Sequence, residues 1–437
     1  MPLVLKNLAE ARRNYLLRRD QLEDLQRRKL LRMLRWAYAY IPLYRSLFRQ
    51  IGKTPEDFQR ASDLRRLPTT TKADLLANYR DGVTARGMRP EVVWSTAGTT
   101  GGPFKVEWTS EMDDVRKALS MRRMLNFGFR PWEKVATIWP KKIVWRHAYD
   151  ASGRRRASTT VYELPFATAF GRPAPTVRVI VSGPPDLTEE VKALNKFGPR
   201  FVYSSPGHLQ KLAEAAKSGK LAVNLKGIFL TGRDISPTSR KELEGAYGAP
   251  TCRSYGATET GSLGGDCTER RGFHLSEDYT YCEVLRGDEP VGPGEVGELV
   301  VTTLHNGIMP LVRYRLGDLV ELADGGRCGC GSSLTRVSSI LGRASDGILT
   351  KAGERIPPLR TVVAIEASTS LREFQVRQTC VDSFTVNVPQ GGASGPGLEE
   401  RLSAVLGAQV GTAVRVSLKE TADFDLEGKA RSILSDA

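Results

Sequence analysis

The chain has 437 residues, of which 40% are hydrophobic and 26% charged, and this predicts a globular protein of two or three domains. It contains no run approaching ~18 consecutive apolar residues, and its first residues lack the apolar core and cleavage site of a signal peptide, so we expect no transmembrane helix and a cytoplasmic location. Six cysteines in a chain of this length do not indicate a disulfide scaffold and are expected to be thiols or metal ligands.

The net charge of +15 raises the question of a nucleic-acid partner. The basic residues are dispersed, in stretches such as 12–20, 27–35 and 146–158, and many fall on helical patterns whose charged face is solvated. No zinc finger, RNA-recognition signature or basic zipper is visible in the sequence. A basic surface that attracts polyanionic small molecules explains the charge equally well, so neither nucleic acid nor membrane is expected as the main partner.

Residues 8–50 are predicted to be helical, because apolar residues recur there at three-to-four spacing among arginines and acids. Pro42 breaks this pattern, and a second, short helix is expected after it. A further helix is expected to begin at Lys72, with Thr71 as its N-cap.

From about residue 90 to 340, short apolar runs alternate with helical segments, which predicts an α/β architecture with parallel sheet. Expected strands include 177–183, 200–205, 225–232 and 297–304, and the expected helices between them are 186–198, 206–219 and 236–248. Near residue 344 the pattern changes to a small α+β unit, with strands at 384–388 and 413–418 and a helix at 397–407. We therefore predict a large N-terminal domain over 1–343, helical in its first part, 1–85, and a small C-terminal domain over 344–437.

One stretch rich in glycine and hydroxyl side chains, STAGTTGGPFK at 95–105, lies between two strand-like segments. Successive backbone N–H groups in such a loop form a nest for anionic oxygens, and the hydroxyls add donors. The same residues are ordinary in turns, so a surface hairpin is the alternative. The stretch lacks the Gly-Lys-Ser/Thr ending of a Walker A loop, so any nucleotide chemistry here is of another kind.

Four later stretches also contain residues that are suited to binding or catalysis. The aromatic ring, glycine and carboxylate of SYGATETG, 254–261, suit stacking on a base and holding a divalent cation, although a plain turn has the same composition. Asp318 in MPLVRYRLGDL suits ribose hydroxyls or, again, a turn. The other two stretches are ILGRASDGILTKAGERIPP, 340–358, at the predicted domain boundary, and DLEGKARSIL, 425–434, which places Lys429 after a glycine.

Together and in this order, these stretches resemble the adenylate-forming (acyl-CoA synthetase) superfamily, and within it the phenylacetate–CoA ligase family and its capsule-biosynthesis-like relatives. The resemblance covers nearly the whole chain and includes 30–52 and 64–79, which are characteristic of this branch. It implies a ligase that uses ATP and Mg²⁺ to activate a carboxylic acid as an acyl-adenylate and then transfers the acyl group to coenzyme A. It also implies that 1–343 is the adenylation domain and that 344–437 is a mobile domain carrying the catalytic lysine.

The resemblance assigns roles to individual residues. The loop Ser95–Gly102 would hold the β- and γ-phosphates of ATP, and Lys429 would reach the α-phosphate and the carboxylate from the small domain. A positive charge and Mg²⁺ at this point would stabilise the charge that builds up as pyrophosphate leaves. The catalytic residues implied are Lys429, Glu259, which would face Mg²⁺, and Thr258, which would face the α-phosphate. The ATP-binding residues implied are Ser95, Thr96, Gly98, Thr99, Thr100, Gly101, Tyr255 for stacking on adenine, Gly256, Asp318 for the ribose hydroxyls, and Arg343.

Several positions depart from the family pattern. Gly102 stands where the family usually has a lysine. Arg233 is the first residue of a pair that is usually Gly-Glu in the family, and Ser345 occupies the hinge position. The glycine-rich acid-binding segment of true phenylacetate ligases is absent, so phenylacetate itself is not the expected substrate. The acid pocket is expected among 139–172 and 203–207, where aromatic residues hint at an aromatic or bulky acid.

A metal site is also predicted. Cys267 and His274 lie in CTERRGFH, and Cys328 and Cys330 lie in the glycine-rich RCGCGSS. Three thiolates and one imidazole make a closed tetrahedral zinc set, whereas four unrelated side chains are the alternative, since cysteine is often a small buried hydrophobe. Similar Cys/His sets recur in relatives of this branch. We predict a structural Zn²⁺ that pins the strand region after Tyr255 to the loop after Asp318.

Other functions stay open from the sequence alone. Transfer of the acyl group to an amine is one, because the segment 350–357 alters a region that relatives use for the pantetheine tunnel. A degenerate relative that only binds nucleotide is another, since Gly102 and Ser345 are changes of that kind, although Glu259 and Lys429 favour the enzyme. A nucleic-acid binder would bind duplexes in a salt-dependent manner. A monomer or a homodimer is expected.

Overall fold

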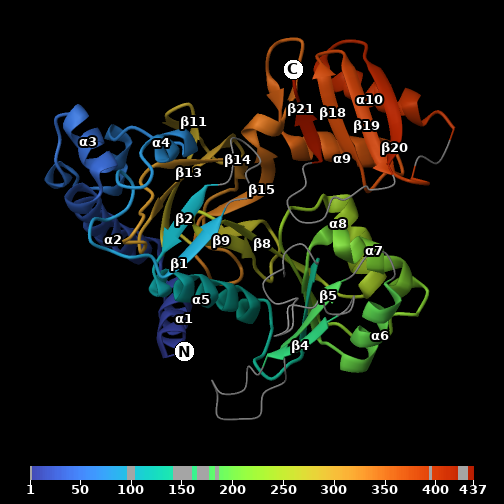
Figure 1. Cartoon of the computed structure of the whole chain (residues 1–437), viewed down its shortest axis with the longest axis horizontal. Helices are drawn as coiled ribbons and strands as arrows, with labels where there is room; N and C mark the ends of the chain where they lie inside the picture. Colours follow the sequence, from blue (N-terminus) through green and yellow to red (C-terminus); the bar gives the residue numbers. More distant parts are fainter. Residues whose placement is uncertain are drawn as a thin grey trace, which may run out of the picture. The chain divides into compact units, whose positions relative to one another are not determined.

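Two units share the chain, which we describe from a computed structural model (Figure 1). The structure describes residues 2–95, 104–140, 160–164, 177–182, 187–392, 396–421 and 432–437. The first unit comprises Met1–Gly128 and Ser254–Ile340, and the second comprises Phe129–Arg253 and Leu341–Ala437. None of the helices in these described ranges is long and apolar enough to cross a bilayer.

Three helices open the first unit, where the sequence pattern predicts two. The break before Pro42 is confirmed, because proline occupies the first turn of the third helix. A second break at Leu16–Arg18 is not predicted by the periodicity; here Leu16 is 57% exposed while the side chain of Tyr15 is buried. The three helices are α1 (Pro2–Tyr15), α2 (Arg19–Tyr40) and α3 (Pro42–Gln50).

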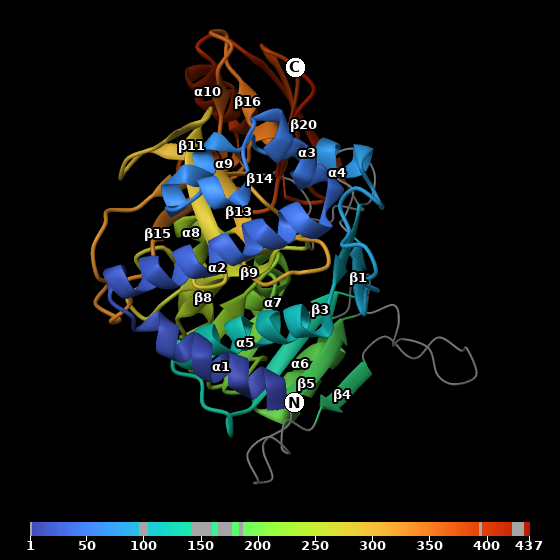
Figure 2. The same ribbon diagram turned by 90° about the vertical axis from the view of Figure 1, so that its left-hand side faces the viewer.

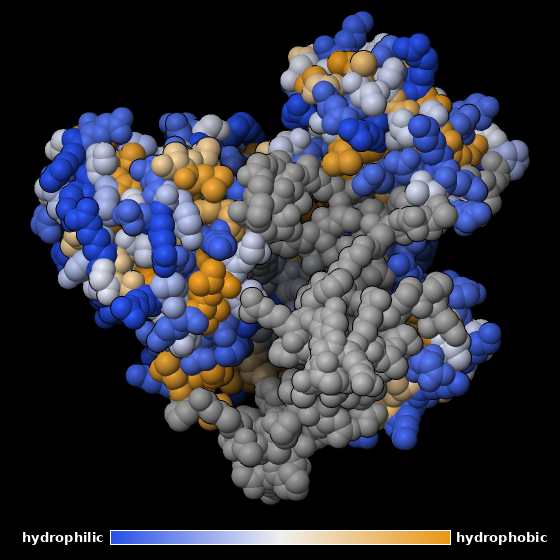
Figure 3. Space-filling view, in the orientation of Figure 1, coloured by the Kyte–Doolittle hydropathy of each residue, from blue (hydrophilic) through white to orange (hydrophobic). Residues whose placement is uncertain are grey.

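Short elements lie between α3 and the next long helix, Ser110–Asn126. Thr71 caps the short helix that begins at Lys72, as predicted. Its hydroxyl accepts the N–H of Asp74, and the Asp74 carboxylate accepts the N–H of Thr71. A hydrophobic area lies over the first strand in Figure 3, where Val93 and Trp94 are 50% and 41% exposed. These elements are α4 (Lys72–Ala77), β1 (Val92–Ser95), β2 (Lys105–Trp108), which pairs antiparallel with β1, and α5 (Ser110–Asn126).

The sheet of the first unit follows the order β12-β11-β13-β14-β15-β10-β9-β8. Its pairs β8–β9, β9–β10, β10–β15, β11–β13 and β13–β14 are antiparallel, which differs from the parallel sheet predicted for this part of the chain. The connections explain the difference, because hairpins as short as Thr258–Thr260 can join only antiparallel strands. The strands are β8 (Thr251–Ala257), β9 (Gly261–Asp266), β10 (Phe273–Leu275), β11 (Thr280–Arg286), β12 (Glu289–Pro290), β13 (Val296–Thr303), β14 (Tyr314–Leu322) and β15 (Arg336–Arg343).

The second unit has the predicted α/β pattern. Strands β7, β6, β3 and β5 run parallel in that order, and β4 pairs antiparallel with β5 at the edge. Apolar strands alternate with amphipathic helices here, and helices α6, α7 and α8 begin and end close to the predicted residues. The elements are β3 (Val135–Pro140), β4 (Thr160–Leu164), β5 (Val177–Ser182), α6 (Thr188–Phe197), β6 (Phe201–Ser204), α7 (Pro206–Lys217), β7 (Gly227–Leu230) and α8 (Pro237–Tyr247).

The C-terminal part of the second unit is the predicted mixture of strands and helices. Its four-stranded sheet has the order β20-β19-β18-β21, with an antiparallel pair, β18–β19, between two parallel pairs. The helices α9 and α10 contribute Ile365, Leu402 and Leu406 to its core. The elements are η5 (Ala344–Asp346), β16 (Ile348–Leu349), β17 (Arg355–Ile356), α9 (Pro358–Ser368), β18 (Gln375–Cys380), β19 (Ser383–Pro389), α10 (Leu398–Val410), β20 (Arg415–Thr421) and β21 (Ile433–Ser435).

One buried arginine connects distant segments of the first unit. Helices α1 and α5 lie side by side, as Figures 1 and 2 both show. From α5, the guanidinium of Arg122 donates to the carboxylate of Asp278 at 2.8 Å, to the carbonyl of Ala11 in α1 at 3.0 Å, and to the hydroxyl of Ser276 at 3.1 Å. Arg122 is 4% exposed and Asp278 is fully buried, so each charge depends on the other for compensation.

Replacing Arg122→Met should lower the free energy of unfolding by about 3–5 kcal/mol, because the carboxylate of Asp278 stays buried without its counter-charge. Urea unfolding followed by circular dichroism measures the change. The matched control is Arg18→Met, which removes an exposed arginine paired with Asp20 and should leave the unfolding midpoint unchanged. Equal midpoints for the two variants would contradict this account of the fold.

Candidate functional site

The structure brings two of the predicted nucleotide-binding residues together. The hydroxyl of Tyr255, in β8, donates to the Oδ2 of Asp318, in β14, at 2.8 Å. The tyrosine is 7% exposed, and its ring meets that of Phe273 edge-on at 6.4 Å between centroids. Residues 63 positions apart in the sequence are therefore held at one place, with an aromatic ring and a carboxylate side by side.

The turn after Tyr255 carries the other predicted residues of this motif. Thr258 and Glu259 lie between β8 and β9, and Glu259 is 7% exposed. The hairpin is tight, because a Cβ on Gly256 would lie 2.4 Å from the carbonyl oxygen of Gly261. No side chain fits there without moving the backbone, so the glycine at 256 is required for this turn.

Two of the remaining predicted nucleotide residues, Ser95 and Arg343, lie in the described part of the chain. Ser95 is the last residue of β1 and pairs with Lys105 of β2. Arg343 ends β15 and belongs to the second unit, next to the predicted hinge, where the Ser345 hydroxyl donates to Asp346 at 2.9 Å. The predicted residues that lie outside the described ranges are Thr96, Gly98, Thr99, Thr100, Gly101 and Lys429.

The four predicted metal ligands lie together in the first unit. The ligand atoms of Cys267, His274, Cys328 and Cys330 are all within 4.8 Å of one another, and three of the four residues are buried. The sulfurs of Cys267 and Cys328 are 3.8 Å apart, and the sulfur of Cys330 is 3.5 Å from the Nε2 of His274. Two pairs of residues that are remote in the sequence thus form one donor set.

The strands around this cluster explain how it forms. Cys267 directly follows β9, and His274 lies in β10, opposite Gly265 of β9. The two strands approach closely, since a Cβ on Gly264 would lie 2.4 Å from the carbonyl oxygen of His274. Cys328 and Cys330 lie in the loop between β14 and β15, so the cluster joins this loop to the β9–β10 hairpin.

Groups outside the cluster orient its members. The Nδ1 of His274 faces the carbonyl of Leu334 at 3.3 Å and donates to it, which leaves Nε2 free to bind a metal. The hydroxyl of Tyr15, the last residue of α1, lies 3.1 Å from the sulfur of Cys330. Hydrogen bonds from Cys267 and Tyr15 lower the pKa of the Cys330 thiol, against the opposing effect of its burial. Burial raises the pKa of Tyr15, so that hydroxyl keeps its proton.

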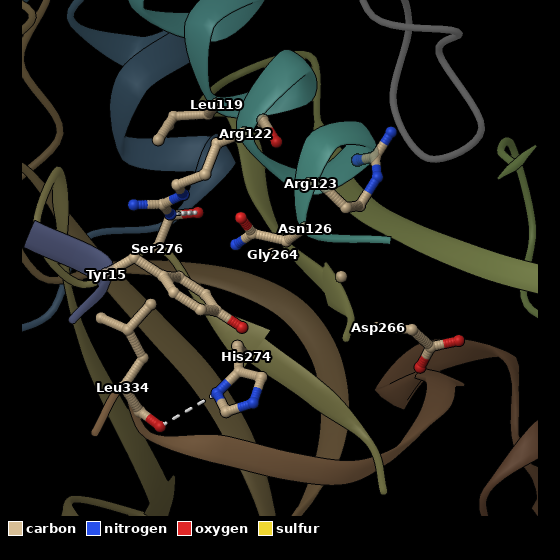
Figure 4. Close-up of a pocket in the computed structure, with 12 residues that line it drawn as sticks. Tyr15, Leu119, Arg122, Arg123, Asn126, Gly264, Asp266, His274, Ser276 and Leu334 are labelled. Carbon is tan, nitrogen blue, oxygen red and sulfur yellow. Dashed lines mark hydrogen bonds between the residues drawn. The ribbon is translucent and has the colours of Figure 1, made fainter. Parts of the chain in front are cut away.

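A small cavity adjoins the cluster. Figure 4 shows Tyr15 and His274 on one side of it and Asn126 of α5 on another. Arg122 and Ser276 also line it, which connects the cavity to the buried ion pair described above. The lining residues are Tyr15, Leu119, Arg122, Arg123, Asn126, Ser262, Gly264, Gly265, Asp266, His274, Ser276 and Leu334.

Two buried residues, of which Tyr15 contacts the Cys/His cluster, are not singled out by the sequence analysis. Tyr15 looks like one more aromatic residue on a helix, and its partner Cys330 is 315 positions away. Arg313 has a positive φ of 48° and is buried, where it donates to the carboxylate of Glu283 and to the carbonyls of Arg65 and Leu67. Nothing local marks either one, because both roles rest on long-range contacts.

Comparison with curated proteins gives relatives over most of the chain. The phenylacetate–coenzyme A ligase of Thermus thermophilus is 29% identical over 369 residues, which cover 82% of this chain and 78% of that protein. The phenylacetate–coenzyme A ligase of Escherichia coli is 27% identical over 84% of this chain and 82% of its own length. The chain is similar to the phenylacetate–coenzyme A ligases over most of its length. The protein CapK of Staphylococcus aureus is also similar, at 21% identity over 74% of this chain and 69% of its own length.

Solved structures of acyl-CoA ligases share the fold of this chain. A 2-hydroxyisobutyryl-CoA ligase in its postadenylation state superposes with a TM-score of 0.76 at 20% identity, over 97% of this chain and 91% of that one. The anthranilate-CoA ligase AuaEII matches with a TM-score of 0.53 at 13% identity over 77% of this chain and 64% of its own. The predicted adenylate-forming fold is confirmed, whereas no family model matches the sequence.

Replacing Tyr255→Phe should cost about 1–2 kcal/mol of the free energy of unfolding, because the carboxylate of Asp318 loses a hydrogen bond from a mostly buried donor. Urea unfolding of the purified variant measures this. Tyr40→Phe serves as the control, since Tyr40 is 45% exposed and keeps its ring against Trp36. A Tyr255→Phe variant as stable as the control would show that the hydrogen bond does not hold these two strands.

Proposed function

We propose that this protein activates a carboxylic acid with ATP to an acyl-adenylate and then transfers the acyl group to coenzyme A. The observation that carries this proposal is the Tyr255–Asp318 pair beside the Glu259 turn, in a chain homologous to phenylacetate–coenzyme A ligases. A ring for adenine, a carboxylate for ribose hydroxyls and a second carboxylate for a cation are the groups that nucleotide binding requires.

The nucleotide would bind against the first unit. Tyr255 would present its ring to adenine, with Gly256 allowing a close backbone approach, and Asp318 would accept hydrogen bonds from the ribose hydroxyls. The loop Ser95–Gly102 would cradle the β- and γ-phosphates through its backbone N–H groups. Arg343 would add a positive charge near the nucleotide.

The first half-reaction would join the acid to the α-phosphorus of ATP with loss of pyrophosphate. Lys429 would hold the carboxylate and the α-phosphate together and offset the negative charge that develops there. Thr258 would donate to the α-phosphate. When bound, Mg²⁺ supplies a further positive charge at the phosphates, and the carboxylate of Glu259 is a fitting oxygen ligand for it.

The small domain, 344–437, would bring Lys429 to the site and then turn about a hinge near Arg343–Asp346 for the second half-reaction. A serine at 345 permits such rotation, because a hinge needs only a few positions able to absorb backbone change. In the second half-reaction the thiol of coenzyme A would displace AMP from the adenylate. The basic character of the chain would favour the phosphates of coenzyme A by charge.

The decisive experiment is acid-dependent exchange between ATP and labelled pyrophosphate over a panel of carboxylic acids, phenylacetate included. Product analysis by mass spectrometry, with coenzyme A and with candidate amines, then identifies the acceptor. Exchange with at least one acid and a coenzyme A thioester as product is the expected result. An adenylate that accumulates with coenzyme A present but is consumed by an amine would replace the thioester step by amide formation.

Replacing Lys429→Ala should slow acid-dependent pyrophosphate exchange by about a hundredfold or more, because one preorganised charge on the transition state is lost. Glu259→Gln should have a similar effect through the cation. The control is Lys419→Ala, which removes an exposed lysine of β20 and should exchange at the wild-type rate. Exchange that survives both substitutions would refute these assignments.

We also propose that Cys267, His274, Cys328 and Cys330 bind a structural Zn²⁺. Bonds of about 2.3 Å to sulfur and about 2.0 Å to nitrogen, arranged as a tetrahedron, separate two sulfurs by about 3.8 Å and a sulfur from a nitrogen by about 3.5 Å. The separations of 3.8 Å for Cys267–Cys328 and 3.5 Å for Cys330–His274 agree with this geometry. Four protein ligands leave no open position, which is typical of a structural site.

Metal analysis of the purified protein should give about one zinc per chain, in keeping with a closed four-ligand site. Cys328→Ser should lower both the zinc content and the melting temperature, because metal binding contributes to folding. Cys380→Ser is the matched control, since Cys380 is the exposed cysteine and lies far along the sequence from the cluster. A fully stable wild-type protein without zinc would remove the proposal.

A further inference from the structure

Tyr15 touches two of the four proposed metal ligands with different parts of its side chain. Its hydroxyl is 3.1 Å from the sulfur of Cys330, and its ring meets the ring of His274 edge-on, with 5.8 Å between centroids. The residue is 8% exposed, and the guanidinium of Arg122 lies 5.5 Å from the centre of its ring. Figure 4 shows the phenol directed from α1 toward His274.

The contact falls where the predicted N-terminal helix breaks. Tyr15 ends α1, and the chain turns before α2 begins at Arg19. Leu22 of α2 is fully buried and packs with Tyr15 and Leu334, the residue whose carbonyl accepts the His274 N–H. Both helices therefore meet the Cys/His cluster at their junction, by a hydrogen bond from α1 and by apolar packing from α2.

The donor and acceptor in this contact follow from the chemistry of the groups. A metal-bound cysteine is a thiolate and can only accept, so the phenol of Tyr15 is the donor. A hydrogen bond to a charged acceptor is about twice as strong as one between neutral groups. Removal of an outer partner of this kind commonly lowers the metal affinity 10- to 100-fold.

We propose that Tyr15 is an outer partner of the metal centre and that the centre, through Tyr15, fastens the N-terminal helices α1 and α2 to the sheet of the first unit. The inference rests on the proposed zinc centre and goes beyond it, because it assigns the centre a task in a segment that supplies no ligand. The metal neutralises the thiolate charge that faces Tyr15, and the tyrosine in turn holds Cys330 in place.

The connection extends to the element that follows the predicted phosphate loop. Helix α1 packs along α5 through Ala11, Val115 and Leu119, and Arg122 of α5 donates to the carbonyl of Ala11. Helix α5 begins directly after β2, which follows the segment 95–102. Loss of the metal would thus loosen α1 first and the packing of α5 next.

The test uses Tyr15→Phe in the zinc-loaded full-length protein, with Tyr40→Phe as the control. Phenylalanine keeps the ring, so the packing with Leu22 and Arg122 is preserved while the hydroxyl is lost. Release of zinc to a chromogenic chelator should be 10- to 100-fold faster for Tyr15→Phe. Hydrogen exchange of α1 should also increase in this variant, and Tyr40→Phe should match the wild type in both measurements.

A second measurement needs no variant. Chelation of zinc from the wild-type protein should raise hydrogen exchange in α1 and at the start of α2 before other parts of the first unit respond. Unchanged exchange in α1 after chelation, or zinc release from Tyr15→Phe at the wild-type rate, would overturn the inference while leaving the metal site intact. A wild-type protein that binds no zinc would instead overturn the metal site, so the two failures are distinguishable.

Discussion

A single buried guanidinium holds the first unit together. Arg122 reaches from α5 to the carboxylate of Asp278, the hydroxyl of Ser276 and the carbonyl of Ala11, and it packs on the ring of Tyr15. Taking such a charge out of water is costly, and the pair is tolerated because several partners satisfy it at once. Its five N–H groups can serve three partners on two segments in a fixed geometry, which a lysine could not do. The contact joins α5 to α1 and to the segment 276–278, and Arg122 also lines the cavity beside the Cys/His cluster.

The nucleotide residues and the metal ligands share the same strands. The turn with Glu259 leads into β9, and Cys267 follows the end of β9. Asp318 lies within β14, and Cys328 lies in the loop that β14 enters. Strand β9 thus lies between the turn of Glu259 and Cys267, and β14 carries Asp318 at its middle and leads into the loop of Cys328. A metal bound at the proposed site would therefore support the walls of the proposed nucleotide site through these two strands.

Sequence reasoning succeeds here where the signal is local. Hydrophobic periodicity predicts the helices of the second unit, and the Thr71 cap follows from a residue and its neighbour three positions on. The Cys/His cluster is predictable because cysteines and histidines are few and the chemistry of zinc constrains their grouping. The resemblance to adenylate-forming ligases rests on the order of several motifs, and the fold agrees with it.

The rest depends on contacts between residues remote in the sequence. The break at Leu16–Arg18 carries no proline or glycine, and Tyr15 just before it contacts a residue 315 positions away. The antiparallel sheet of the first unit follows from hairpin lengths, which alternation of strands and helices does not reveal. The roles of Lys429 and of the loop after Ser95 stay predictions, since those residues lie outside the described ranges.

Strand β9 also acts as a spacer. Its six residues separate the turn of Glu259 from Cys267, and at 3.3 Å per residue the Cα atoms at its two ends are roughly 17 Å apart. A metal bound at the proposed site could therefore be exchanged for another tetrahedral ion without entering the coordination of Glu259. Cobalt at the proposed metal site would be a spectroscopic reporter inside the protein, and its colour would follow the attachment of the N-terminal helices.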